Sequence, residues 1–331
     1  MRNNRLRRWA ALALAGLLLA VFVLPGQAQP PVFTPSTIVQ GQSFSIRADS
    51  VTAAAGLHPA DILGAGPIVL IACADLGLVC YDAGGDVDDL GALSYGADFI
   101  VNDLPPVQFG VAAGAKGQKD TAVAAEAGCN PAQPQADVFE SAYNGDNAQD
   151  LDGDGADCAD NAGYGLGLTE AAQVDSIDAL ATDPCGTVDL DCDGLPERPI
   201  YFSLAPNSPS LAIFGASAAD ILTAGGGLFA ELWAAGSALG LAQNDVIDAL
   251  CLNESGDGVY GLGDVVVLSL APGSPSLTAL GASGGDLIAV APLRVAAAAE
   301  VLGLDPGDNL TAAQCQQFVP RDLYMPRLGR Q

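Results

Sequence analysis

The sequence predicts an all-β protein in which four repeated units close into a four-bladed propeller-like ring. The first observation is a motif of an aspartate, an aliphatic residue two positions later and then small or aliphatic residues. The motif occurs four times, starting at Asp88, Asp175, Asp245 and Asp308. A unit that recurs roughly every 65 to 90 residues buries its apolar face only against its neighbours.

The second observation is that each unit holds about four short strand-like runs, which is the size of a propeller blade. Runs rich in β-branched and aromatic residues, bounded by proline and glycine, follow three of the aspartate motifs. These runs are 106–111, 200–204 and 265–270. Two of them continue into nearly identical nine-residue segments, 203–211 and 269–277. Later in each unit come a small residue, an aspartate and an aliphatic residue, with the aspartates Asp61, Asp137, Asp220 and Asp286. Each unit then ends with Leu-Gly-Leu, at 76–78, 166–168, 239–241 and 302–304.

The third observation is the order of parts at the two ends of the repeat region. The first strand, 43–46, corresponds to the second strand of a unit, and the last motif, 308–313, corresponds to the first. Pairing the two would complete the fourth blade from both ends and would hide the edge strands. An open sandwich or a solenoid of the same strands is the alternative. The alanine-rich stretches 229–239 and 295–302 could instead form short helices, because alanine has the highest helix propensity.

Residues 1–28 have the pattern of an export signal. Four arginines precede an apolar run from residue 9 to 24, and Pro25 and a small-residue cleavage site at Ala28 follow. A retained membrane anchor is disfavoured, because the run is short and ends in these features. We expect a linker at 29–42, the repeat domain at 43–317 with an Asp/Gly-rich insertion at about 113–165, and a tail at 318–331. The expected location is secreted or extracytoplasmic, with no membrane span after signal cleavage.

The chain is strongly acidic. Its formal net charge is −27, and removal of the four leader arginines makes it −31. Such a surface repels nucleic acids and anionic membranes and attracts cations. Solubility explains most of these carboxylates equally well. The expected partner is an extracellular protein or glycan, and no nucleic acid.

Eight cysteines in an exported chain indicate disulfides. Spacing favours Cys73 with Cys80, Cys185 with Cys192, and Cys129 with Cys158, which leaves Cys251 and Cys315; this is one of many possible connectivities. The sequence has no C-x-x-C pair of the kind that binds zinc.

Three segments have the spacing of calcium-binding loops, with oxygen ligands on alternate residues and glycine at the sixth position. The predicted ligands are Asp150, Asp152 and Asp154 in the first loop, Asp189, Asp191 and Asp193 in the second, and Asn253, Ser255, Asp257 and Asp264 in the third. The segments resemble the calcium loops of dockerins and thrombospondin type 3 repeats. The first two loops lack an acidic twelfth residue, so we expect weak Ca²⁺ binding, with a Kd of roughly 10⁻⁴ to 10⁻³ M. The alternative is that aspartate and glycine cluster here only because they form turns.

The four motif aspartates, one per unit, raise a second possibility. A closed ring would place Asp88, Asp175, Asp245 and Asp308 around a common axis, where a central cation would relieve their repulsion. The alternative is that each aspartate caps the turn that leads into its strand.

The aliphatic-Asp-Ala segments at 177–179 and 247–249, each followed by an acidic, glycine-containing loop and a strand-like run, resemble the hemopexin-type four-bladed propeller repeat. This resemblance covers most of the chain after the signal. It implies a propeller whose inner strands open onto a central channel that holds cations. The equivalent segments 90–92 and 310–312 depart from the pattern, and the family's later Tyr-Trp signature is missing.

No residue is a candidate for catalysis. The G-x-S-x-G string at 281–285 falls within the repeat, where the equivalents of Ser283 are Ser217 and the chain's only histidine, His58. A Ser-His-Asp triad and a histidine-ligated zinc site are therefore disfavoured. The sequence favours a secreted, calcium-binding repeat protein that acts as a binding or structural surface module without catalysis. The alternative is a secreted glycoside hydrolase that uses paired carboxylates, since 39 acidic residues make such pairs easy to find.

Overall fold

The computed structural model describes residues 42–53, 56–81, 88–95, 106–156, 158, 165–171, 173–182, 200–225, 228–255 and 258–315. All described residues belong to one compact unit, Thr34–Gln331.

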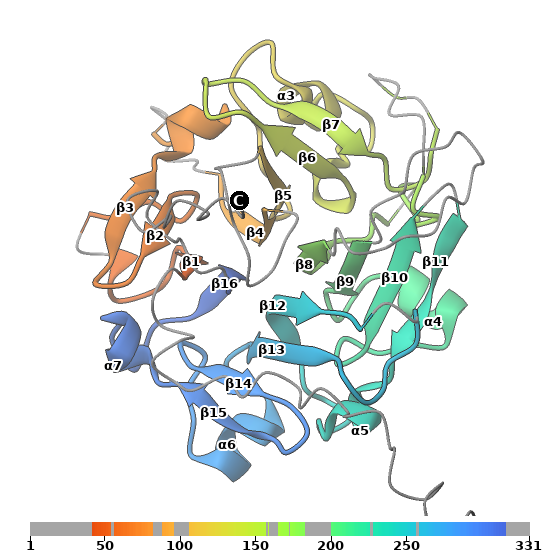
Figure 1. Cartoon of the computed structure of the whole chain (residues 1–331). Helices are drawn as coiled ribbons and strands as arrows, with labels where there is room; N and C mark the ends of the chain where they lie inside the picture. Colours follow the sequence, from red (N-terminus) through yellow and green to blue (C-terminus); the bar gives the residue numbers. More distant parts are fainter. Residues whose placement is uncertain are drawn as a thin grey trace, which may run out of the picture. The chain divides into compact units, whose positions relative to one another are not determined.

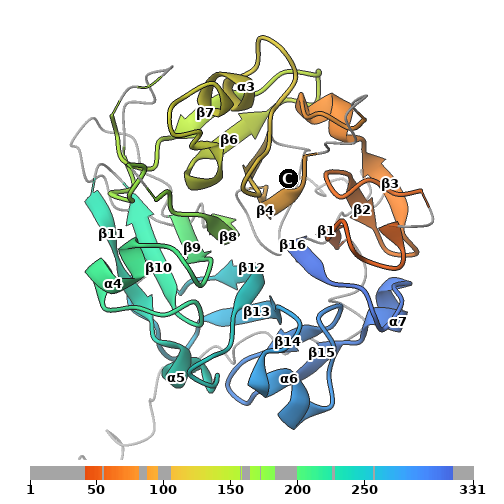
Figure 2. The same cartoon turned by 180° about the vertical axis from the view of Figure 1, so that it is seen from behind.

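The described residues form four antiparallel, four-stranded sheets arranged as the blades of a propeller (Figures 1 and 2). In the order of the sheet, blade 1 contains β16 (Leu310–Gln314), β1 (Ser43–Ile46), β2 (Ile62–Gly64) and β3 (Ile68–Ile71). Blade 2 contains β4 (Leu90–Ser94), β5 (Val107–Val111), β6 (Val138–Ser141) and β7 (Ala148–Leu151). Blade 3 contains β8 (Ile177–Thr182), β9 (Ile200–Leu204), β10 (Ile221–Gly225) and β11 (Leu228–Ala234). Blade 4 contains β12 (Ile247–Asn253), β13 (Val265–Leu270), β14 (Leu287–Ala289) and β15 (Arg294–Ala297). The predicted four-bladed propeller is confirmed, and the sandwich and solenoid alternatives are wrong.

The ring closes as the order of parts predicts. Strand β1 pairs with β16 antiparallel, with Phe44 opposite Ala313 and Ser45 opposite Ala312. The two strands, at opposite ends of the colour bar, lie side by side in both views (Figures 1 and 2). The innermost strands β16, β4, β8 and β12 each contact their neighbours around the ring. Both ends of the repeat region therefore complete one blade.

Packing between blades explains why the strands lack the alternation of apolar and polar residues that is typical of sheets with one solvated face. In β5 and β9 every residue is buried, because each blade packs against a neighbour on both sides. One core cluster, which includes Ile62 and Phe109, joins blades 1 and 2. A second, which includes Val138 and Phe202, joins blades 2 and 3, and a third joins blades 3 and 4.

Short helices lie in the connections between strands. They are η2 (Cys73–Leu76), α3 (Ala122–Ala127), η3 (Pro134–Ala136), α4 (Ser210–Phe214), α5 (Gly236–Leu239), α6 (Pro275–Leu280) and α7 (Ala299–Leu302). The two alanine-rich stretches each split into an outer strand followed by a short helix, β11 with α5 and β15 with α7. Among the described residues, no helix is long and apolar enough to cross a membrane.

Three of the four Leu-Gly-Leu segments are helix ends and not strands. In three units the glycine adopts a left-handed conformation directly after the short helix, at Gly77, Gly240 and Gly303, with φ of 74°, 85° and 80°. A residue with a side chain is strained there, which explains the glycine. The leucines on either side are buried and anchor the connection to the core.

The four motif aspartates cap loops, as the alternative to a central cation site predicts. One oxygen of each accepts the backbone N–H of the residue directly after Leu-Gly-Leu of the preceding unit; these donors are Val79, Thr169, Ala242 and Asp305, at 2.5 to 2.8 Å. The other oxygen accepts an N–H from the loop after the second strand of the same blade; these donors are Lys116, Ser210, Ser276 and Thr52, at 2.7 to 3.0 Å. Each carboxylate is buried and fastens one blade to the next.

Three disulfides lie in the described part of the chain, and they match the spacing. They are Cys73–Cys80, Cys129–Cys158 and Cys251–Cys315. Cys185 and Cys192 lie outside the described residues. Cys251 is in β12 and Cys315 directly follows β16, so this disulfide links the innermost strands of blades 4 and 1.

We predict that replacing Cys251 and Cys315 with alanine lowers stability more than replacing Cys73 and Cys80. The first pair spans 64 residues and the second spans 7. Because the loss grows with the size of the closed loop, we expect about 4 kcal/mol against roughly 2 kcal/mol. Urea unfolding of the two double variants measures the difference. Equal losses would contradict the dependence of the stabilisation on the size of the closed loop.

Candidate metal centre

A second set of aspartates lies just before the third strand of each blade. In three blades one carboxylate oxygen accepts the N–H of the residue three positions earlier; these donors are His58, Ser217 and Ser283, at 2.6 to 3.1 Å. The other oxygen accepts an N–H from the segment after the fourth strand; these donors are Cys73, Gly236 and Ala299, at 2.6 to 2.9 Å. The aspartates are Asp61, Asp220 and Asp286. Both of their oxygens are therefore satisfied by the backbone.

Blade 2 breaks this pattern at a single residue. The position three before Asp137 is Pro134, and proline has no N–H to donate. Oδ1 of Asp137 keeps the bond that is found in the other three blades, and here it accepts from Gly153 N at 2.9 Å. Oδ2 is buried and has no N–H donor among the described residues, so its possible partner is a protonated Glu170 carboxyl. An oxygen that accepts a backbone N–H in the other three blades thus has no such donor in this one.

Two more carboxylates converge on Asp137. Oxygen atoms of Asp137, Asp152 and Glu170 all lie within 4.8 Å of one another. The three side chains are 0%, 3% and 3% exposed. Glu170 Oε2 accepts from Gln133 Nε2 at 2.9 Å, while Oε1 is buried without an N–H donor in the described part of the chain. We call these three residues the acidic trio.

The electrostatics of the acidic trio are unfavourable without a counter-ion. Burial raises the pKa of Asp137, and the nearby carboxylates of Glu126 and Asp152 raise it further. Burial also raises the pKa of Glu170, with Asp137 as the next cause. Buried like charges are costly unless protons or a cation neutralise them. The trio therefore brings carboxyl oxygens to one point, where a hydrogen bond between the Asp137 and Glu170 side chains shares a proton.

A glycine makes the approach of these groups possible. A Cβ on Gly153 would lie 2.3 Å from Glu170 Oε1 and 2.9 Å from the Ala136 side chain. The segment that begins with Asp152 and Gly153 takes the place of the short helix found in the other blades. Its backbone turns around one carboxylate, because Asp152 Oδ1 accepts from Asp154 N at 3.0 Å and from Gly155 N at 2.5 Å.

Of the three ligands predicted in the first loop, only Asp152 belongs to the trio. Asp150 lies in β7 and accepts a hydrogen bond from Gln108 Nε2. Asp154 Oδ1 accepts from Ala156 N at 2.7 Å in a local turn. The structure does not bring these three carboxylates to one point.

The third predicted loop is partly described. Asn253 ends β12, and Asp264 accepts hydrogen bonds from Ser255 N at 2.8 Å and Gly261 N at 2.7 Å. Asp264 thus closes this loop through the backbone. Asp257, and all of Asp189, Asp191 and Asp193 in the second loop, lie outside the described residues, so metal binding there stays a prediction.

Sequence reasoning did not identify Asp137 and Glu170 as ligands. Asp137 looks like one more repeat aspartate, and Glu170 belongs to no motif. The usable signal is Pro134, since the other units have a residue with an N–H at that position. A repeat aspartate that loses a donor becomes available to a ligand.

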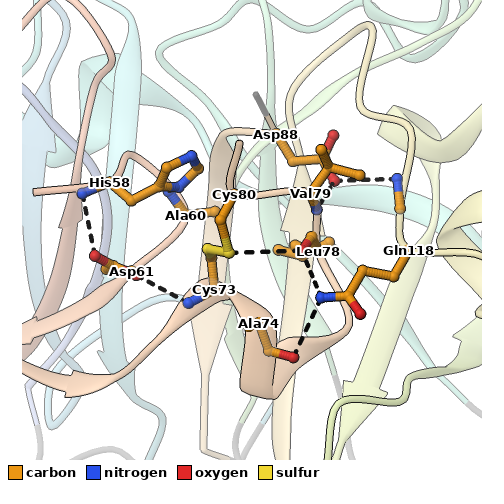
Figure 3. The surroundings of a disulfide bond; sticks show 11 residues. His58, Ala60, Asp61, Cys73, Ala74, Leu78, Val79, Cys80, Asp88 and Gln118 are labelled. Atoms are coloured by element: carbon orange, nitrogen blue, oxygen red, sulfur yellow. Dashed lines mark hydrogen bonds between the residues drawn. A yellow bond between two sulfur atoms is a disulfide. The ribbon is translucent and has the colours of Figure 1, made fainter. Parts of the chain in front are cut away.

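A second group of possible ligands surrounds a disulfide (Figure 3). Atoms of His58, Asp61 and Cys73 lie within 4.8 Å of one another. Cys73 is bonded to Cys80, and Asp61 accepts two backbone hydrogen bonds. His58 Nδ1 accepts from Ala60 N at 3.1 Å, and burial lowers the pKa of this histidine. The group is a structural turn, consistent with the place of His58 in the repeat.

Comparisons with protein family models, with curated proteins and with solved structures found no match.

We predict that one substitution has opposite effects in two blades when divalent ions are removed by a chelator. Asp220→Asn should destabilise the protein by about 1 to 2 kcal/mol, because an amide group then faces a backbone N–H. Asp137→Asn should stabilise it by about 1 kcal/mol, because it removes a buried charge and its amide can donate to Glu170. Urea unfolding at pH 8 measures both. Equal destabilisation would make Asp137 an ordinary capping residue.

Proposed function

We propose that this protein is a secreted, calcium-binding propeller that acts as a binding or structural surface module without catalysis. The observation that carries the proposal is the acidic trio, in which three buried carboxyl groups converge and two of their oxygen atoms have no N–H donor among the described residues. Buried carboxylates of this kind are paired or coordinate metals.

The ligand atoms favour Ca²⁺ over other common metal ions. All three side chains offer hard carboxylate oxygens, which suit Ca²⁺, Mg²⁺ and Mn²⁺ and not the nitrogen and sulfur preference of Zn²⁺. Mg²⁺ is less suitable, because it demands near-ideal octahedral geometry and releases its water reluctantly. Ca²⁺ accepts irregular sites and completes its shell with backbone carbonyls or water.

A bound ion at the trio would connect three separate segments. Asp137 precedes β6, Asp152 follows β7, and Glu170 lies in the connection from blade 2 to blade 3. Neutralising their charge would hold the segment that follows β7 against the body of the blade. Ion binding would then contribute directly to the stability of the folded state.

The remaining sequence features fit within the same proposal. The second and third Asp-rich segments would act as further calcium loops similar to those of dockerins and thrombospondin type 3 repeats. The repeat pattern is similar to the hemopexin-type propeller repeat. Three disulfides support an extracellular location.

The acidic trio does not support the glycoside hydrolase alternative. A glycan cannot reach side chains that are at most 3% exposed. The carboxylates that act on glycosidic bonds are separated by roughly 5 to 9.5 Å, whereas the trio oxygens lie within 4.8 Å.

We predict that Ca²⁺ raises the melting temperature through the trio. With a Kd of about 10⁻⁴ M, 5 mM Ca²⁺ should add about 2 kcal/mol, or roughly 4 to 8 °C, over the same protein in chelator. Asp137→Asn and Glu170→Gln should abolish this shift, and Asp220→Asn should keep it as the matched control. Thermal unfolding followed by circular dichroism gives the result.

Two outcomes separate the parts of this proposal. A calcium shift that survives Asp137→Asn but is lost in Asp191→Ala would move the metal site to the second loop. Equal melting temperatures with Ca²⁺ and with chelator would refute calcium binding and leave the Asp-rich segments as turns.

A further inference from the structure

A cavity of about 460 Å³ lies where the inner strands begin. Asp178 and Asp248, which are equivalent residues near the starts of β8 and β12, both line it. Thr311 holds the equivalent position in β16. Blade 2 has Gly91 there, and Asp89 next to β4 supplies the carboxylate instead. The cavity therefore draws residues from all four blades at one end of the ring axis.

The lining of this axial cavity has more negatively than positively charged side chains. They are three carboxylates, of Asp89, Asp178 and Asp248, and one guanidinium, of Arg47. The Arg47 side chain is half exposed and also pairs with Asp49, at 3.5 Å. Two negative charges of the lining thus have no positive partner within the lining itself.

Unused polar atoms also face the cavity. Thr311 is 8% exposed, lines the cavity and has no hydrogen-bond partner for Oγ1 among the described residues. Asp89 Oδ1 likewise has none in the described part of the chain. Asp248 Oδ2 is the exception, because it accepts from Asn309 Nδ2 at 2.6 Å. Buried polar atoms in folded proteins are normally bonded, so these open acceptors point to a donor that arrives with a ligand.

The arrangement suits an extended ligand better than a metal ion. In the described residues, only three groups of histidine, cysteine and acidic side chains bring their ligand atoms within 4.8 Å of one another, and the axial aspartates are not one of them. Their carboxylates are too far apart as a set for one ion to bridge. The cavity has the volume of a small-molecule site, and Ile177, Val246 and Pro272 give it apolar walls.

We propose that the axial cavity binds a short aliphatic diamine in its doubly charged form. One ammonium group would lie against Asp178 and Asp248, and the other would lie against Asp89. The methylene chain would cover the apolar wall, and Thr311 Oγ1 would accept an N–H. Two ammonium groups match the two unbalanced charges of the lining.

Protons compete with the diamine for the cavity carboxylates, so the binding affinity depends on pH in a defined direction. Burial raises the pKa of Asp89 to about 7, and burial also raises the pKa values of Asp178 and Asp248. Arg47 opposes the rise at all three, whereas Asp49 adds to it at Asp248. A diamine stays charged until about pH 10, so it binds best once these carboxylates have ionised. Its affinity therefore increases from pH 5 to pH 8.

Isothermal titration calorimetry with 1,4-diaminobutane tests the proposal, in chelator so that calcium sites do not contribute. We expect binding to the native protein, at least tenfold weaker binding of butylamine, and none of 1,4-butanediol. Asp178→Asn with Asp248→Asn should weaken the diamine at least tenfold, as expected when a charged partner is lost. Glu231→Gln, an exposed position on β11, is the matched control and should change nothing.

A second variant is expected to bind the diamine more tightly, and an unfolded protein could not give that result. Arg47→Gln removes the cation that competes for the same carboxylates, so the diamine should bind more tightly, by several-fold. Equal affinity in the native protein and the double aspartate variant would overturn the proposal, as would butylamine binding as well as the diamine. Displacement of the diamine by Ca²⁺ would also overturn it, by making the cavity a metal site. Asp137→Asn should leave diamine binding intact, so failure here is distinct from failure of the calcium proposal.

Discussion

The structure depends on how buried carboxylates obtain hydrogen bonds. A buried, ionised aspartate is tolerated only where donors or opposite charges surround it. This chain places eight aspartates at two repeated positions, and seven of them have a backbone N–H for each oxygen. The first set fastens each blade to the next, and the second fixes the turn before each third strand. The acidity of the chain is therefore partly a structural requirement of the propeller.

Both proposed sites lie where carboxylates lack this pattern of backbone N–H donors. Asp137 loses one donor to Pro134, and its free oxygen meets Glu170 and Asp152 in a blade that also carries the insertion. At the axis, Asp178 and Asp248 lie among apolar residues with little positive charge nearby. The two sites differ in geometry, because the first brings oxygen atoms to one point and the second spreads them around a cavity. That difference separates an ion from an extended cation as ligand.

Much of the fold could be predicted from the sequence, because repetition makes equivalent positions visible. The strand that starts at Ser43 and the motif that starts at Asp308 are complementary parts of a unit, and they do pair. Cysteine spacing predicted two of the three disulfides found among the described residues, and the third joins the pair that remained. Spacing did not show that Asp150 accepts a hydrogen bond from Gln108 or that Asp154 accepts one from Ala156 in its own loop. Glu170 and Asp137 belong to separate segments, the connection to blade 3 and the turn before β6, and no local pattern reports their contact.

The pairing of β1 with β16 also constrains when the protein can fold. Residues that are more than 260 positions apart form the same blade, with Phe44 opposite Ala313. Such contacts have a large loop-closure entropy and slow the folding rate of a chain with high contact order. The first blade cannot assemble until the last repeat has left the ribosome. The other three blades are each built from consecutive strands, so blade 1 is the one whose completion waits for the end of the chain.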